Sequence, residues 1–209
     1  MDYLLHRDAL IDTGRYFHSR GWSLGTSSNY SIVVSRDPLR LLITASGKDK
    51  GRLGRDDFVV VDQHGKPIDP AMPKPSAETL LHTRTAFLNP GVGSILHTHS
   101  VWGTILSDLN PAGFDIAGYE MLKGLSGIST HDHHYRMPVV ENTQDIAALA
   151  ADLTPRLTLG QPGAFDHGYL LRKHGLYTWG TDLDEARRHV EIYEFLFEVV
   201  ARRQSLLTR

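Results

Sequence analysis

The sequence of 209 residues contains no cysteine. Without thiols, the chain can form neither disulfides nor cysteine-ligated zinc sites, and it has no thiol nucleophile. Any transition metal must therefore be bound by histidine and carboxylate side chains. The 12 histidines make that kind of site worth searching for.

Long apolar runs and an excess of one charge are also lacking. No run approaches the roughly 18–20 apolar residues of a membrane-spanning helix, and the charged first twenty residues do not have the pattern of a secretory signal. Lys and Arg number 22 against 24 Asp and Glu, a net charge of −2 that disfavours binding to nucleic acid or acidic membranes through bulk charge. We therefore expect a cytoplasmic protein without nucleic-acid or membrane partners.

Several nucleotide and protease motifs are missing as well. The sequence contains no G-x-G-x-x-G and no H-E-x-x-H. The run around Gly47 and Lys48 is not a P-loop, because no glycine stands five positions before Gly47 and Asp49 replaces the required Ser or Thr. Nucleotide-cofactor and metalloprotease functions become less favoured accordingly.

The order of apolar patterns and turn signals predicts one α/β domain spanning residues 1–209, with a mainly antiparallel or mixed sheet. The length is sufficient for one domain with a substantial core. Ser76 and Thr143 are the expected N-caps of two of the helices. Helices are expected over 1–20, 76–88, 100–109, 145–153 and from 182 onward, and strands over 26–34, 39–51, 58–62, 91–99 and, as two strands joined at His174-Gly175, 168–180.

Two histidine patterns point to a metal site. His97 and His99 are two residues apart on an expected strand, so both imidazoles leave the same face and can bind one ion. His174 lies at the tip of an apolar two-strand unit, where it could supply a third ligand. The run His131 to His134 has more histidines but no apolar support, so we interpret it as an exposed loop.

Two glutamates are candidates for proton transfer beside such a metal. Glu78 could instead be an acid that stabilises the start of a helix. Glu120 lies among apolar neighbours, and burial there would raise its pKa. The alternative for Glu120 is a solvated helix face with Lys123 nearby.

Three short runs rich in small hydroxyl residues and glycine could offer N–H and O–H donors to a phosphate group. Each run by itself is also an ordinary turn. The runs are residues 26–29 (TSSN), 44–48 (TASGK) and 75–76 (PS).

Together these pieces resemble the class II aldolase family. TSSN, TASGK, PSAE, HTHS and KHG occur in the family's order between residues 26 and 175, so the resemblance covers nearly the whole chain. Within the family, GYEMLKG, PVVENTQD and RKHGLYTWG are similar to a dehydratase branch that serves methionine salvage. The substrate that this branch implies is a ketose phosphate ending in a thioether.

The resemblance implies a three-layer fold, with a central, mostly antiparallel or mixed sheet flanked by helices, in a cyclic homotetramer with one Zn²⁺ per subunit. It implies that Zn²⁺ acts as a Lewis acid on the ketone and that Glu120 moves the proton that the dehydration requires. Glu78 stands where the aldolases have their acid/base glutamate and some dehydratases a cysteine, so it either assists zinc or substrate or indicates retained aldolase chemistry. The family's zinc ligands match His97, His99 and His174, and its phosphate loops match Asn29, Ser46, Gly47 and Ser76.

Other functions stay open at this stage. The nearest is a class II aldolase or epimerase acting on another sugar phosphate. A non-catalytic interaction module, as in adducin heads, is a second possibility, although the three histidines argue against it. A cupin-like iron oxygenase is disfavoured by the expected helices. Iron, manganese or cobalt could replace zinc at nitrogen ligands.

Overall fold

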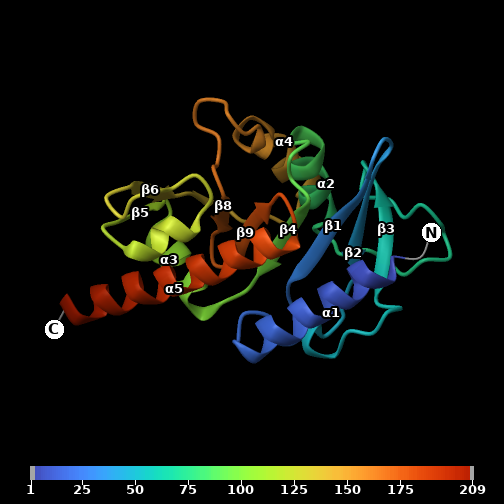
Figure 1. The fold of residues 1–209 in the computed structure, drawn as a ribbon, viewed down its shortest axis with the longest axis horizontal. Coiled ribbons are helices and arrows are strands. Elements are labelled where there is room, and N and C mark those ends of the chain that lie inside the picture. Colours follow the sequence, from blue (N-terminus) through green and yellow to red (C-terminus); the bar gives the residue numbers. More distant parts are fainter. Residues whose placement is uncertain (1–2, 208–209) are drawn as a thin grey trace.

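The computed structural model describes residues 3–207 (Figure 1). Five α-helices and two short 3₁₀ helices lie in this part of the chain: α1 (Leu4–Ser19), η1 (Lys50–Arg52), α2 (Thr79–Leu88), α3 (Val101–Leu109), η2 (Glu120–Gly124), α4 (Ile146–Leu157) and α5 (Leu183–Leu207). The strands are β1 (Asn29–Arg36), β2 (Leu39–Thr44), β3 (Phe58–Asp62), β4 (Ser94–Thr98), β5 (Phe114–Ala117), β6 (His134–Met137), β7 (Val139–Val140), β8 (Gly168–Leu171) and β9 (Gly175–Gly180).

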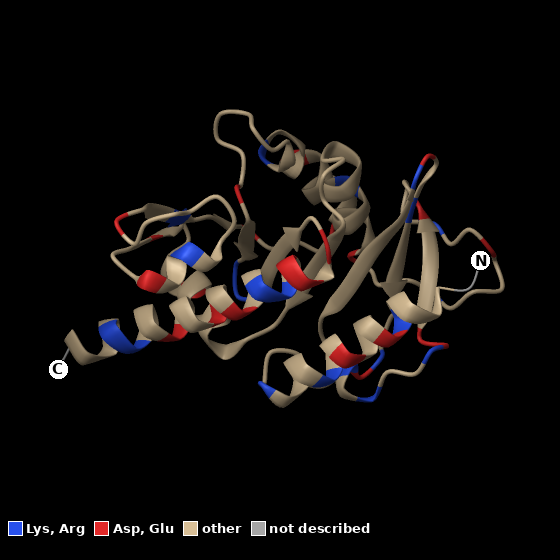
Figure 2. Cartoon of the chain, viewed as in Figure 1, with Lys and Arg blue, Asp and Glu red and all other residues tan. Residues whose placement is uncertain are grey.

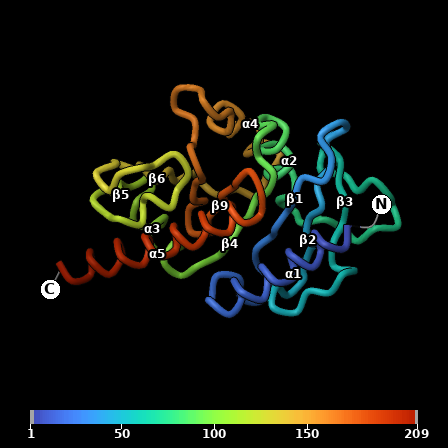
Figure 3. Tube along the Cα trace, viewed as in Figure 1, coloured from blue at the N-terminus to red at the C-terminus, as the bar shows by residue number. Residues whose placement is uncertain are grey.

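Seven of these strands form the central sheet, in the order β3-β2-β1-β4-β9-β8-β7. Neighbouring strands are antiparallel except β7 and β8, which pair in parallel, so the expected mixed sheet is confirmed. Strands β5 and β6 form a separate antiparallel pair. The sheet places β4 between β1 and β9, at the middle of the molecule (Figure 3).

Helices cover both faces of the sheet and make three layers. Side chains alternate between the faces along a strand, and in β2 Leu41 and Ile43 pack in the core beneath α2 and α4, whereas Leu42 packs in the core beneath α1. The N-terminal part of α5 packs into the same core as α1, through Ala186 and Val190. Further along, α5 packs with α3, η2 and the β5–β6 pair around a third apolar core.

Sequence patterns predicted the long elements and failed at several short ones. The pair β5–β6 was not predicted, and His134, assigned to an exposed loop, instead begins β6, although it stays exposed. Ser76 is not the N-cap of α2, because Glu78 holds that position without a side-chain cap. Asp145, rather than Thr143, caps α4 by accepting a hydrogen bond from the Ala148 N–H at 3.0 Å.

Charged residues lie mainly on the outer helices and loops. Figure 2 shows both signs interspersed along α1 and α5, whereas the strands of the sheet are largely uncharged. In residues 3–207, no helix combines the length and the apolar character that crossing a membrane requires.

A close backbone approach fixes the position of the β8–β9 turn against β4. A Cβ added at Gly175 would lie 2.1 Å from the carbonyl oxygen of Thr98 and 3.2 Å from Cε1 of His97. No side chain fits there unless the two strands separate. Glycine at this position lets the two histidine-bearing segments come into contact.

We predict that Gly175→Ala lowers the free energy of unfolding by about 1–3 kcal/mol, the usual cost of an overpacked core position. Chemical denaturation followed by circular dichroism measures the change. Gly91→Ala is the matched control, because a Cβ there meets nothing within 4 Å. Equal stability of the two variants would contradict the close approach.

Candidate metal centre

Strand β4 and the β8–β9 turn bring three imidazoles together. His97 lies at the end of β4, His99 follows it, and His174 occupies the turn before β9. Antiparallel pairing sets Thr98 opposite Leu176, which brings His174, two residues earlier, beside the histidine pair. The three residues that the HTH and KHG patterns singled out therefore form one cluster able to hold a metal ion.

The Nε2 atoms of the three imidazoles face a common point. They are separated by 2.7 Å for His97 and His99, 3.0 Å for His99 and His174, and 3.3 Å for His97 and His174. A tetrahedral ion with metal–nitrogen bonds of about 2.0–2.1 Å places its ligands roughly 3.4 Å apart. The cluster is thus close to the size that an ion requires.

Hydrogen bonds on the opposite ring atoms direct the lone pairs inward. The Nδ1–H of His97 donates to the carbonyl oxygen of Leu176 at 2.8 Å, and that of His174 faces Oδ1 of Asn142 at 3.4 Å. Tyr177 stacks on the His97 ring, with centroids 4.0 Å apart and an angle of 16° between the planes. Partners on Nδ1 leave Nε2 as the metal-binding atom, an arrangement common around metal-bound histidines.

Burial keeps the imidazoles of His97 and His99 neutral, the form that binds a metal. His97 is fully buried, which holds its pKa well below the usual value, and the neighbouring His99 and His174 lower it further. Burial lowers the pKa of His99 to about 4, again with His174 contributing. The donor set fits a divalent ion of the zinc type, because neutral imidazole nitrogens with inward lone pairs are what such an ion binds.

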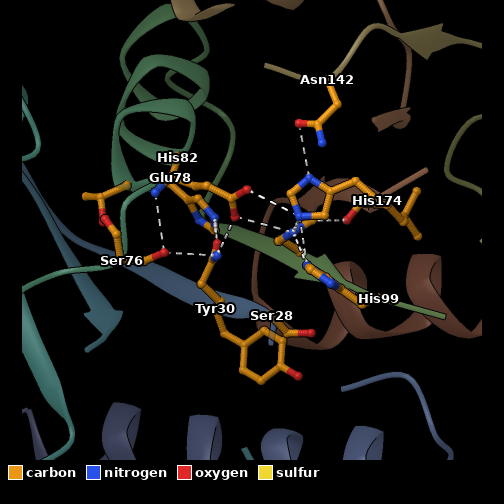
Figure 4. Close-up of polar contacts among 12 residues, drawn as sticks. Ser28, Tyr30, Ser76, Glu78, His82, His99, Asn142 and His174 are labelled. Carbon is orange, nitrogen blue, oxygen red and sulfur yellow. Dashed lines mark hydrogen bonds and ion pairs between the residues drawn. The ribbon is translucent and has the colours of Figure 1, made fainter. Parts of the chain in front are cut away.

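Glu78 faces the same point from the start of α2 (Figure 4). Its Oε2 lies 3.4 Å from Nε2 of His97, and its Oε1 lies 3.4 Å from Nε2 of His174. Asn29 donates from Nδ2 to Oε2 of Glu78 at 2.9 Å and to Oγ of Ser76 at 3.1 Å. Glu78 therefore lies beside the histidine cluster, where its carboxylate could serve as a further ligand or move protons.

A cavity of about 330 Å³ opens beside the cluster. His99, His174 and Glu78 contribute to its wall, and each of the three hydroxyl-rich runs contributes as well. The N–H and hydroxyl donors of these runs could bind a phosphate group in the same cavity that the histidines face. The cavity's remaining wall residues are Thr26, Ser27, Ser28, Asn29, Ala45, Ser46, Gly47, Lys50, Ser76, Ala77, Thr143, Gln144 and Ile146.

Glu120 is placed differently from the other candidates. It begins η2, is not among the residues that line this cavity, and its side chain is 67% exposed. Its pKa is lowered, first by the hydrogen bond from Lys123 and then by the charges of Lys123 and His131. Of the two interpretations left open for Glu120, the single chain shows the exposed one with Lys123 nearby, so burial does not raise its pKa here.

Two polar residues of the site were missed in the sequence. Lys50 is buried, lines the cavity and donates from Nζ to the carbonyl oxygen of Lys48 at 2.6 Å; burial lowers its pKa to about 8. His82 is fully buried in α2 behind Asn29. No local sequence pattern distinguishes either residue. Lys50 stands two positions after Lys48, so nothing in the sequence sets it apart as the buried lysine. His82 lies in a helix without a clear apolar stripe, so the sequence does not show which of its faces is buried.

Comparison with known proteins identifies the class. Residues 8–201 match the family described as Class II Aldolase and Adducin N-terminal domain, and the chain belongs to this family. The fold is similar to that of an L-fuculose 1-phosphate aldolase, with a TM-score of 0.80 and 21% identity over 99% of this chain and 89% of the other. The l-fuculose-1-phosphate aldolase from Thermus thermophilus gives a TM-score of 0.75 and 20% identity over 98% of both chains.

More similar sequences carry a more specific name. A methylthioribulose-1-phosphate dehydratase of Pseudomonas fluorescens (strain Pf0-1) is 47% identical over 201 residues, which are 96% of this chain and 94% of that protein. The dehydratase of Marinobacter nauticus is 46% identical over 200 residues, covering 94% of this chain and 92% of that protein.

We predict that His97→Ala abolishes stoichiometric binding of a divalent metal, because the substitution removes one of the three ligands and leaves a cavity where the imidazole ring was. Metal analysis by inductively coupled plasma mass spectrometry after dialysis measures the loss. His133→Ala, at an exposed position outside the cluster, is the control that should keep the metal. A His97→Ala protein with unchanged metal content would refute the assignment.

Proposed function

We propose that this chain is a zinc-dependent methylthioribulose-1-phosphate dehydratase. The reaction removes water from 5-methylthioribulose 1-phosphate and gives 2,3-diketo-5-methylthiopentyl 1-phosphate, a step of methionine salvage. The observation that carries the proposal is the 47% identity to a protein of that name over nearly the full length of both chains. The three-histidine cluster supports it, because dehydration beside a ketone benefits from a Lewis acid.

Three groups of residues at the cavity would take separate roles in this reaction. Zn²⁺ held by His97, His99 and His174, one ion per subunit, would polarise the ketone and make the adjacent C–H acidic. Ser46, Gly47 and Ser76 would bind the phosphate through N–H and O–H donors, and Asn29 would hold this side of the cavity by donating to Ser76. Glu78, held as a hydrogen-bond acceptor by Asn29, is in place to orient the reacting hydroxyl or to assist the metal.

Glu120 is our proposed catalytic acid/base, acting from a neighbouring copy. In its own chain Glu120 is exposed and outside the cavity, so it can serve the reaction only where a second subunit brings it to a metal centre. A homotetramer of single-domain chains, which we propose as the assembly, would provide that contact.

We predict that Glu120→Gln keeps the metal and loses turnover by at least about 100-fold, the usual scale for removing a general acid/base. Mixing Glu120→Gln with His97→Ala subunits tests the origin of the carboxylate. Hybrids would regain activity, because each hybrid can contain one site with an intact metal and a neighbour's Glu120. Full activity in Glu120→Gln alone would contradict the role.

A class II aldolase or epimerase acting on another sugar phosphate is the second candidate. The observation in its favour is Glu78, a carboxylate facing the histidines from the position where aldolases have their acid/base glutamate. Incubation with 5-methylthioribulose 1-phosphate, with metal content measured on the same sample, separates the two. A zinc-dependent diketone product supports the dehydratase, whereas two carbonyl fragments, or bound zinc without turnover, would overturn it.

A further inference from the structure

A continuous chain of buried and partly buried hydrogen bonds leads from the middle of the sheet to Glu78. Ser31 of β1 contacts His82 of α2, with Oγ and Nδ1 2.8 Å apart. His82 Nε2 contacts Oδ1 of Asn29, and Asn29 Nδ2 reaches Glu78 at 2.9 Å. Figure 4 shows Glu78, the N-cap of α2, and His82, within α2, close together beside the site.

The direction of each bond in this chain is determined by its chemistry. An amide oxygen only accepts, so the bond between His82 and Asn29 requires a proton on Nε2 of His82. His82 is 0% exposed, and burial lowers its pKa to about 3, so the ring is neutral and carries one proton. Nδ1 is therefore an acceptor, and the hydroxyl of Ser31 donates to it.

The opposite orientation of the Asn29 amide is unfavourable. A flipped amide would place Oδ1 against the carboxylate oxygen of Glu78, so that two acceptors face each other at hydrogen-bond distance. It would also set the Asn29 NH₂ group against the Nε2–H of His82. The acceptor-only carboxylate of Glu78 thus selects the orientation in which Asn29 donates to Glu78 and to Ser76, and the Nε2–H of His82 holds that orientation by donating to Oδ1.

We propose that His82 is a positioning residue, which locks the amide of Asn29 so that Glu78 is held as an acceptor beside the metal centre. The proposal rests on the proposed function, because it assigns the lock to the dehydration reaction. His82 lies behind Asn29 and does not line the cavity, so it acts only through its neighbour. Partners of this kind behind a metal site typically change activity by about 10- to 100-fold when removed.

Two substitutions separate this role from ordinary packing. Glutamine carries its amide nitrogen near the position of Nε2, so His82→Gln can still donate to Asn29. Asparagine carries its amide near the position of Nδ1, so His82→Asn can still contact Ser31 but leaves Oδ1 of Asn29 without its donor. Both variants remove a buried ring, so both should lower the melting temperature.

We expect His82→Asn to lower kcat/KM about 10- to 100-fold, mainly in kcat, with the metal retained. His82→Gln should stay within about threefold of the wild type, since the hydrogen bond to Asn29 survives. Equal losses in the two variants, an active His82→Asn, or a loss carried by KM alone would overturn the proposal.

Nitrogen-15 NMR of the unmodified protein gives a readout that needs no substrate. We expect the His82 ring to be protonated on Nε2, unprotonated on Nδ1 and unchanged from pH 5 to pH 8. Protonation on Nδ1 would overturn the proposal. If the wild type does not turn over 5-methylthioribulose 1-phosphate, the proposed function fails, and the NMR measurement still decides the state of His82.

Discussion

The convergence of three imidazole nitrogens on one point is the constraint on which the rest of this structure depends. Acceptors 2.7–3.3 Å apart repel one another unless a cation or protons lie between them. Protonation is disfavoured where the rings are buried, as the lowered pKa values of His97 and His99 show. The fold therefore maintains an arrangement that a divalent metal relieves. Antiparallel pairing of β4 with β9, and a glycine at the β8–β9 turn, make the arrangement possible.

The second element of the site is the polar connection between α2 and the sheet. Glu78 at the start of α2 and Asn29 at the start of β1 come from segments 49 positions apart and meet beside the histidines. A carboxylate so close to the metal centre has a stable orientation only if its hydrogen-bond partners are themselves fixed. Asn29 and Ser76, which we propose on the phosphate side, line the same cavity, and Asn29 donates to both Ser76 and Glu78.

The features that could be predicted from the sequence are those that depend on neighbouring residues along the chain. His97 and His99 could be paired because alternation along a strand is local, and the apolar frame around His174 marked it as a candidate third partner. The register that sets Thr98 opposite Leu176 is a property of strand pairing, which local patterns do not contain. His82 and Lys50 could not be found because their roles depend on burial by distant segments. Glu120 is the opposite case: its neighbours in the sequence are apolar, but its side chain is exposed in the folded chain.

X-ray absorption spectroscopy of the zinc-loaded chain examines the metal centre itself. We predict that the ion is coordinated by three imidazole nitrogens at about 2.0–2.1 Å, with oxygen completing the coordination sphere. Replacing His174 with alanine should remove one imidazole from that coordination sphere or prevent zinc binding. A coordination sphere made of oxygen alone, or one that His174→Ala leaves unchanged, would contradict a metal centre built by His97, His99 and His174.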